Sequence, residues 1–111
     1  MKNLIYLLCL VYLSLISFNS FAARIDNTVI LGIQNGTSGD FIITLPPNSD
    51  PKCTNGGVYF YVAAGQNGLN SDGVKVLLSL ALVAYSSGVK VHVVYDNSTQ
   101  ACFVSSINVL K

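Results

Sequence analysis

The sequence predicts a mainly β domain with one long helix and one disulfide bond. Short runs rich in valine, isoleucine and aromatic residues alternate with clusters of glycine, asparagine, aspartate and serine, which is typical of strands and turns. One stretch, residues 71–88, instead has the periodicity of an apolar helix. Two cysteines, Cys53 and Cys102, lie in the part of the chain that is expected to be exported.

The first 22 residues have the pattern of a cleavable signal peptide. Lys2 gives the charged start, residues 4–18 give an apolar run, and Ser20-Phe21-Ala22 is a small-x-small motif before a cut between Ala22 and Ala23. We expect a bacterial protein that is secreted or periplasmic, with one domain formed by residues 23–111. The alternatives are an uncleaved membrane anchor and a lipoprotein. The apolar run is shorter than the ~20 residues of a spanning helix, and Cys9 follows bulky residues rather than small ones.

The exported part has a formal charge near zero. Its basic residues are Arg24, Lys52, Lys75, Lys90 and Lys111, and they are matched by aspartates with no glutamate. Phosphate binding needs a surplus of basic residues on one face. This composition therefore excludes nucleic acid as the expected partner, and it also argues against binding to a membrane surface by charge.

Cys53 and Cys102 are predicted to form a disulfide, because they are the only cysteines left after signal cleavage in an oxidising compartment. Closing a loop of about 50 residues stabilises a fold by roughly 4 kcal/mol in the chain-entropy model. Two free thiols or half of a metal site are the alternatives. His92 is the only histidine, so no metal ligand set is complete and no cofactor is predicted.

Three strands are expected before the helix. Residues 25–34 form the first, with a bulge at Gly32, and a turn at 35–40 leads to the second at 41–45. The proline-containing segment 46–57 is expected to be a loop held by its cysteine. The third strand, residues 58–62, alternates: Val58, Phe60 and Val62 face one side, and Tyr59 and Tyr61 face the other.

The helix is expected to begin at Ser71 or Asp72 and to end at Gly88, where a left-handed residue is usually needed. Its apolar face comprises Val74, Leu77, Leu78, Ala81, Leu82 and Tyr85, extended around the back by Val76, Leu80, Val83 and Ala84. Such a helix is too apolar to be covered by one face of a small sheet. We therefore expect a second partner, most simply another copy of the chain.

Two strands follow the helix. In the first, Val89, Val91, Val93 and Tyr95 share one face, and Lys90 and His92 share the other. In the second, residues 102–110, one face carries Phe103, Ile107 and Val109, and the other carries Cys102, Val104, Ser106 and Asn108. The order β-β-β-α-β-β predicts a five-stranded Greek-key barrel of the OB-fold type, with the helix plugging one end. An open α+β sheet is the alternative, whereas a ferredoxin-like sandwich would need two helices.

Residues 71–111 read SDGVKVLLSLALVAYSSGVKVHVVYDNSTQACFVSSINVLK. This run resembles the C-terminal half of the pentameric B subunits of bacterial AB-type toxins, most closely the subtilase cytotoxin B-subunit-like family, in which a long helix ending in an Ala-Tyr pair precedes two closing strands. Ala84-Tyr85 matches that pair. The resemblance implies an OB-fold, a ring of five subunits, a catalytic A subunit as partner and a glycan receptor. The chain departs from the family because its helix lacks the many charged residues that a water-filled central pore would favour, and has only Lys75 near that position.

Catalysis is not expected, because the exported part has scattered aspartates, one histidine and no glutamate. His92 and Asp96 could approach each other near a strand end, but a lone histidine on a strand is more often a packed or solvated residue. No catalytic residue is therefore predicted.

A binding module fits the residues better. OB barrels bind ligands on the second and third strands and on nearby loops, which points to Tyr59, Tyr61, Asp96 and Asn97 as glycan contacts. The alternative function is a standalone secreted or periplasmic domain that binds a protein partner, of the inhibitor or envelope-stress type.

Overall fold

The computed structural model describes residues 22–36 and 38–110, and in these ranges the chain forms six strands and two helices. They are β1 (Ala22–Thr28), β2 (Gly32–Asn35), β3 (Phe41–Thr44), α2 (Thr54–Gly57), β4 (Tyr59–Val62), α3 (Ser71–Ser87), β5 (Val91–Asp96) and β6 (Phe103–Val109). The fold is therefore mainly β, as predicted. No helix within these ranges has the length and apolarity needed to cross a membrane. The predicted signal peptide lies outside the described residues, apart from Ala22.

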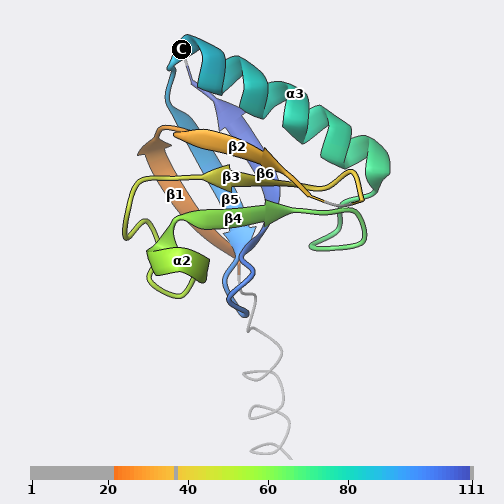
Figure 1. Ribbon diagram of the computed structural model, residues 1–111, viewed down its shortest axis with the longest axis horizontal. Helices are drawn as coiled ribbons and strands as arrows, with labels where there is room; N and C mark the ends of the chain where they lie inside the picture. Colours follow the sequence, from red (N-terminus) through yellow and green to blue (C-terminus); the bar gives the residue numbers. More distant parts are fainter. Residues whose placement is uncertain (1–21, 37, 111) are drawn as a thin grey trace, which may run out of the picture.

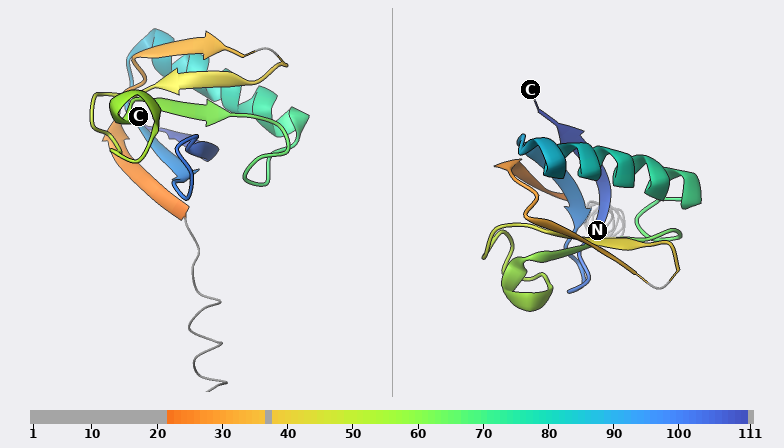
Figure 2. Two further views of the ribbon diagram at one scale, coloured as in Figure 1. Left: turned by 60° about the horizontal axis from the view of Figure 1, so that its bottom comes forward. Right: turned by 45° about the horizontal axis from the view of Figure 1, so that its top comes forward.

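All six strands belong to one sheet with the order β1-β5-β6-β4-β3-β2. Every neighbouring pair is antiparallel except β4 and β6, which are parallel. The strands β2, β3 and β4 run across the direction of β1, β5 and β6, and α3 lies along one end of both groups (Figures 1 and 2). The sheet is thus strongly bent around a single core.

The expected barrel of five strands is not confirmed, because the sheet has six strands and is not closed. The predicted first strand, residues 25–34, is in fact two strands. Its backbone turns at Asn27, which has a left-handed φ of 52°, and residues 29–31 are outside both strands. As a result β1 pairs with β5, while β2 pairs with β3 at the opposite end of the strand order. The predicted bulge at Gly32 lies instead between Ile25 and Thr28.

The core lies between the inner faces of the strands and α3. The alternation predicted for β4 is confirmed at Phe60 and Val62, which are fully buried, whereas Tyr59 and Tyr61 are half-buried on the outer face. Phe60 meets the ring of Tyr95 edge-on, with 4.9 Å between ring centroids. The inner face predicted for β5 is also confirmed, since its buried residues are Val91, Val93 and Tyr95.

α3 starts and ends close to the predicted positions. Its N-cap is Asn70, one residue before the expected Ser71, and the Asn70 side chain accepts a hydrogen bond from the Gly73 N–H. Gly88 ends the helix in a left-handed conformation with φ 70°, as expected, and its N–H donates to the carbonyl of Ala84.

The buried stripe of α3 is narrower than the predicted face. It consists of Val74, Leu77, Ala81 and Ala84, because the helix packs along β6 and β2 on one side only. The prediction was therefore wrong for Leu82 and Tyr85, which are exposed, and for Ala84, which is buried. The exposed large apolar residues of the helix are Val76, Leu82, Val83 and Tyr85, and we call this set the α3 outer stripe.

The predicted disulfide between Cys53 and Cys102 is present, with an S–S distance of 2.02 Å and 5.6 Å between the Cα atoms. Both residues are buried. The bond joins the segment 46–57 to the start of β6. This segment is not a plain loop as predicted, because it contains α2, a single turn in which Asn55 and Gly56 have positive φ.

Candidate functional site

The two predicted tyrosines stand on the outer face of β4. Tyr59 and Tyr61 lie on the side opposite the buried Phe60, and each ring is half-exposed. Neither hydroxyl forms a hydrogen bond with another described residue. The strand therefore offers two partly open rings, each with a free donor and acceptor at its tip.

The strand register places Tyr61 in a row of residues that crosses the whole sheet. Tyr61 is opposite Ile42 on β3 and opposite Phe103 on β6, and Phe103 is opposite Asp96 on β5. The centroids of the Tyr61 and Phe103 rings are 6.4 Å apart. We call this set the outer row, and its members in sheet order are Gln34, Ile42, Tyr61, Phe103 and Asp96. On β1 the partner of Asp96 is Ala22, the last residue before the predicted cleavage site.

Phe103 is the site residue that the sequence pattern missed. Strict alternation placed it with Ile107 on one face, but the pairing of β5 with β6 shifts between Val94 and Tyr95, so one residue of β6 is extra. Val104 and Ile107 are both buried as a result, and Phe103 turns outward beside Tyr61. A bulge of this kind leaves no mark in the alternation of apolar residues.

Asp96 ends the aromatic part of the outer row with a negative charge. Its carboxylate accepts a hydrogen bond from the Ser98 N–H at 2.8 Å. Hydrogen bonds from the Ser98 backbone and side chain hold the pKa of Asp96 below the ordinary value of 3.8. The carboxylate is therefore ionised at neutral pH and stays available as an acceptor next to the Phe103 ring.

Asn97 is not part of this face, although the sequence pattern grouped it with Asp96. Its side-chain amide donates to the Asp50 carboxylate at 3.3 Å, on the side of the 46–57 segment. The same carboxylate oxygen accepts the Tyr95 hydroxyl at 2.7 Å, and the other accepts the Lys52 N–H at 3.0 Å. Asn97 thus has a structural role in this arrangement.

Asp50 is buried, with 8% of its surface exposed. Burial alone raises the pKa of a carboxyl group, but the hydrogen bonds from Tyr95, Lys52 and Asn97, with the Lys52 charge, together hold the pKa of Asp50 below 3.8. Burial and the Asp50 carboxylate raise the pKa of Tyr95. This ionised, hydrogen-bonded centre fixes the 46–57 segment against β5, and nothing in the local sequence around Asp50 predicts it.

The loop after β4 reaches the edge of the outer row. Asn67 adopts a left-handed φ of 50°, and its side-chain amide donates to the Phe103 carbonyl at 2.8 Å. This contact fixes the start of β6, and hence the Phe103 ring, relative to Tyr61. Asn67 therefore positions Phe103, a role that the sequence pattern did not indicate.

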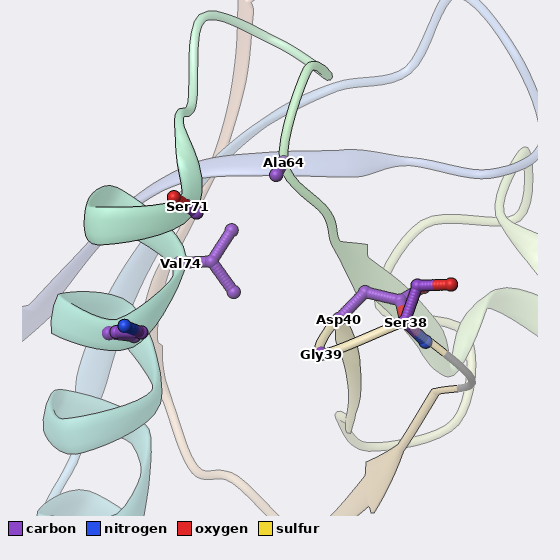
Figure 3. Close-up of a pocket in the computed structure, with 7 residues that line it drawn as sticks. Ser38, Gly39, Asp40, Ala64, Ser71 and Val74 are labelled. Carbon is purple, nitrogen blue, oxygen red and sulfur yellow. The ribbon is translucent and has the colours of Figure 1, made fainter.

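A hollow of about 200 Å³ lies between the β2–β3 hairpin and the first turn of α3. Its lining residues are Ser38, Gly39, Asp40, Ala64, Ser71, Val74 and Lys75. Val74 points into the hollow from the helix, whereas Asp40 and Ser38 lie together on the hairpin side (Figure 3). The Asp40 carboxylate accepts the Ser38 N–H at 3.1 Å, so it serves the hairpin turn and gives no sign of holding a ligand.

The approach of His92 to Asp96, which the sequence left open as a possibility, is not observed. His92 contacts Asp26 and Asn27 of β1 instead, so His92 and Asp96 form no acid-base pair. No group of three or more metal-binding side chains occurs within 22–36 and 38–110. The described surface therefore offers stacking and hydrogen bonding by Tyr59, Tyr61 and Asp96.

No protein-family model matches the chain, and no curated protein sequence matches it either.

Proposed function

We propose that this chain is an exported, non-catalytic binding domain that recognises glycans through the outer row and Tyr59. The observation that carries the proposal is the placement of the Tyr61 and Phe103 rings side by side, followed by the ionised Asp96. A sugar ring has one apolar face that stacks on aromatic rings, and its hydroxyls donate to carboxylates and exchange hydrogen bonds with phenols. The outer row and Tyr59 together carry aromatic rings, phenol hydroxyls and a carboxylate, which are the groups that such a sugar ring would contact.

The strand order supports an OB-like barrel as the architecture. β1 and β2 are the two ends of the order β1-β5-β6-β4-β3-β2, and they follow each other in the chain. If they are counted as one broken strand, that strand neighbours both β5 and β3, as in a barrel, and α3 lies along one end (Figure 1). The outer row then crosses the strands on which OB barrels carry ligands. This is also the architecture implied by the resemblance to the subtilase cytotoxin B-subunit-like family, whose export, glycan receptor and catalytic A subunit we extend to this chain as proposals.

The test is a glycan array probed with the purified exported protein. Wild type is expected to bind a defined set of glycans, and Tyr61→Ala is expected to weaken that binding tenfold or more, about 1.4 kcal/mol, because the central ring of the row is lost. Tyr61→Phe keeps the ring and should retain most of the affinity. Ser106→Ala, an exposed change on β6 outside the row, is the matched control. An array on which wild type binds nothing counts against the proposal.

We also propose that the domain assembles as a homo-oligomer, a ring of five being the form implied by the resemblance. The α3 outer stripe supports this, since it exposes four large apolar side chains on one helix, and Leu31, which is 52% exposed, precedes the neighbouring strand β2. Large apolar side chains that are exposed on one helix in this way are typical of protein interfaces. Burying it between subunits would complete the cover of the helix.

The assembly is tested by light scattering coupled to size-exclusion chromatography. Wild type is expected to elute as a multimer, and Val83→Asp should raise the dissociation constant tenfold or more, because it places a charge in an apolar contact. Thr99→Asp, at an exposed position in the turn between β5 and β6, adds the same charge outside α3; it is the control and should leave the multimer intact. A wild-type protein that remains monomeric at all concentrations would remove the proposed assembly but leave the glycan face unaffected.

The alternative function is a standalone domain that binds a protein partner. Half-exposed tyrosines are enriched in protein interfaces as well as in sugar sites, so the outer row favours this function too. The two are distinguished by the glycan array: a blank array together with capture of a protein partner that Tyr61→Ala abolishes would favour the protein-binding domain.

A further inference from the structure

His92 makes two contacts through a single ring nitrogen. Its Nδ1 accepts a hydrogen bond from the Asn27 N–H at 3.1 Å, and the same Nδ1 lies 3.3 Å from a carboxylate oxygen of Asp26. The imidazole side chain is 18% exposed, so it is largely packed between the strands yet still reached by solvent. Both partners belong to the end of β1, where its pairing with β5 becomes irregular.

The two contacts require opposite protonation states. An Nδ1 that accepts the Asn27 N–H must carry a free lone pair, so the neutral ring holds its proton on Nε2. A protonated ring donates from both nitrogens, and its Nδ1–H can then bond only to the Asp26 carboxylate. Protonation of Nδ1 therefore breaks its hydrogen bond with the Asn27 N–H and allows a new one to the Asp26 carboxylate.

We propose that His92 is a pH-sensitive switch that controls the backbone at the end of β1. In the neutral state it holds Asn27 in its left-handed conformation, with φ 52°. When the ring gains a proton, Nδ1–H turns to Asp26 and the Asn27 N–H loses its partner. Asparagine tolerates this region of backbone conformation better than other non-glycine residues, so the change is the loss of this one hydrogen bond at the end of β1.

The charged groups around the ring fit this exchange. On β1, the Asp26 oxygen that lies near the His92 ring also pairs with the Arg24 side chain. Lys90, which directly precedes β5, is exposed and lies two residues before His92 in the chain. On β6, the residue opposite His92 is the uncharged Asn108. The carboxylate of Asp26 is therefore the one acceptor among these neighbours that favours the protonated ring.

Asn27 lies where several elements meet. It lines a hollow of about 270 Å³ together with Gly88, Val89, Lys90 and Leu110, where α3 passes into β5. The chain then crosses through residues 29–31 to β2, on which α3 packs. The hydrogen bond at Asn27 therefore lies beside the end of α3 and just before the connection from β1 to β2.

The switch is tested by nitrogen-15 NMR of the imidazole and of the Asn27 amide between pH 8 and pH 5. At pH 8 the Nδ1 resonance should be that of an unprotonated nitrogen. As the ring gains a proton, the hydrogen-exchange protection of the Asn27 amide, corrected for intrinsic rates, should fall about tenfold with the same midpoint.

His92→Asn is the control variant, because its side-chain oxygen can accept the Asn27 N–H near the position of Nδ1 but does not titrate. This variant should keep the Asn27 amide protected across the whole range. Asp26→Asn should reduce the pH-dependent change, since the competing acceptor for Nδ1–H is weakened. An Asn27 amide that stays protected in wild type after the ring is protonated, or an Nδ1 that already carries a proton at pH 8, would overturn the proposal.

Discussion

Replacing Cys53 and Cys102 together by alanine is expected to lower the free energy of unfolding by about 4 kcal/mol. The bond joins residues that are 49 positions apart, so its loss frees a long loop in the unfolded chain. It also releases the 46–57 segment from the start of β6, where both sulfurs are buried. For a domain of this size, the loss corresponds to a fall in Tm of roughly 15–30 °C.

Chemical denaturation of wild type and of the double alanine variant measures this effect. Wild type unfolded in the presence of a reductant should behave like the variant, and Ser106→Ala serves as a control for an exposed substitution. A variant whose unfolding free energy lies within about 1 kcal/mol of wild type would show that the remaining contacts of the segment hold it without the covalent bond.

Asp50→Ala is expected to have the second largest effect, a loss of about 2–3 kcal/mol. The substitution removes the acceptor of three hydrogen bonds, and it leaves the buried Tyr95 hydroxyl without its partner. Asp40→Ala, which removes a carboxylate from the exposed hairpin, is the matched control and should cost much less. Thermal unfolding at neutral pH compares the two.

The stability of wild type should also depend on pH through Asp50. The pKa of this carboxyl is lower in the folded state than its ordinary value of 3.8, so its contribution is fully present above pH 3.8 and is lost as the pH falls further. Wild type should therefore approach Asp50→Ala in Tm at the acid end of a titration from pH 7 to pH 2. A constant difference over that range would contradict the role assigned to Asp50.

Features determined by local pattern were predictable from the sequence. The alternation of Tyr59 to Val62 correctly separates the inner from the outer side chains, and Gly88 correctly marks the end of the helix. The pairing of Cys53 with Cys102 followed from the small number of cysteines in a chain that the sequence predicts to be exported. Each of these three features depends on a few neighbouring residues or on the number of cysteines, and none of them requires knowledge of distant contacts.

Features determined by long-range pairing were not predictable. The break after Asn27 depends on β1 and β2 finding partners at opposite ends of the strand order. The outward turn of Phe103 depends on a bulge against β5. Asn97 joins Asp50, 47 residues away, rather than the outer row. Tyr59, Tyr61 and Asp96 could therefore be predicted from the sequence, whereas Phe103, which lies between Tyr61 and Asp96 in the outer row, could not.

Glycan binding through the outer row is tested most directly by NMR mapping of the bound face, with a glycan selected on the array. Amide and aromatic resonances of Tyr61, Phe103 and Asp96 should shift most, and saturation transfer from the rings should reach the apolar face of the sugar. Shifts concentrated instead around the hollow lined by Asp40 and Lys75, with the three row residues unchanged, would contradict the account.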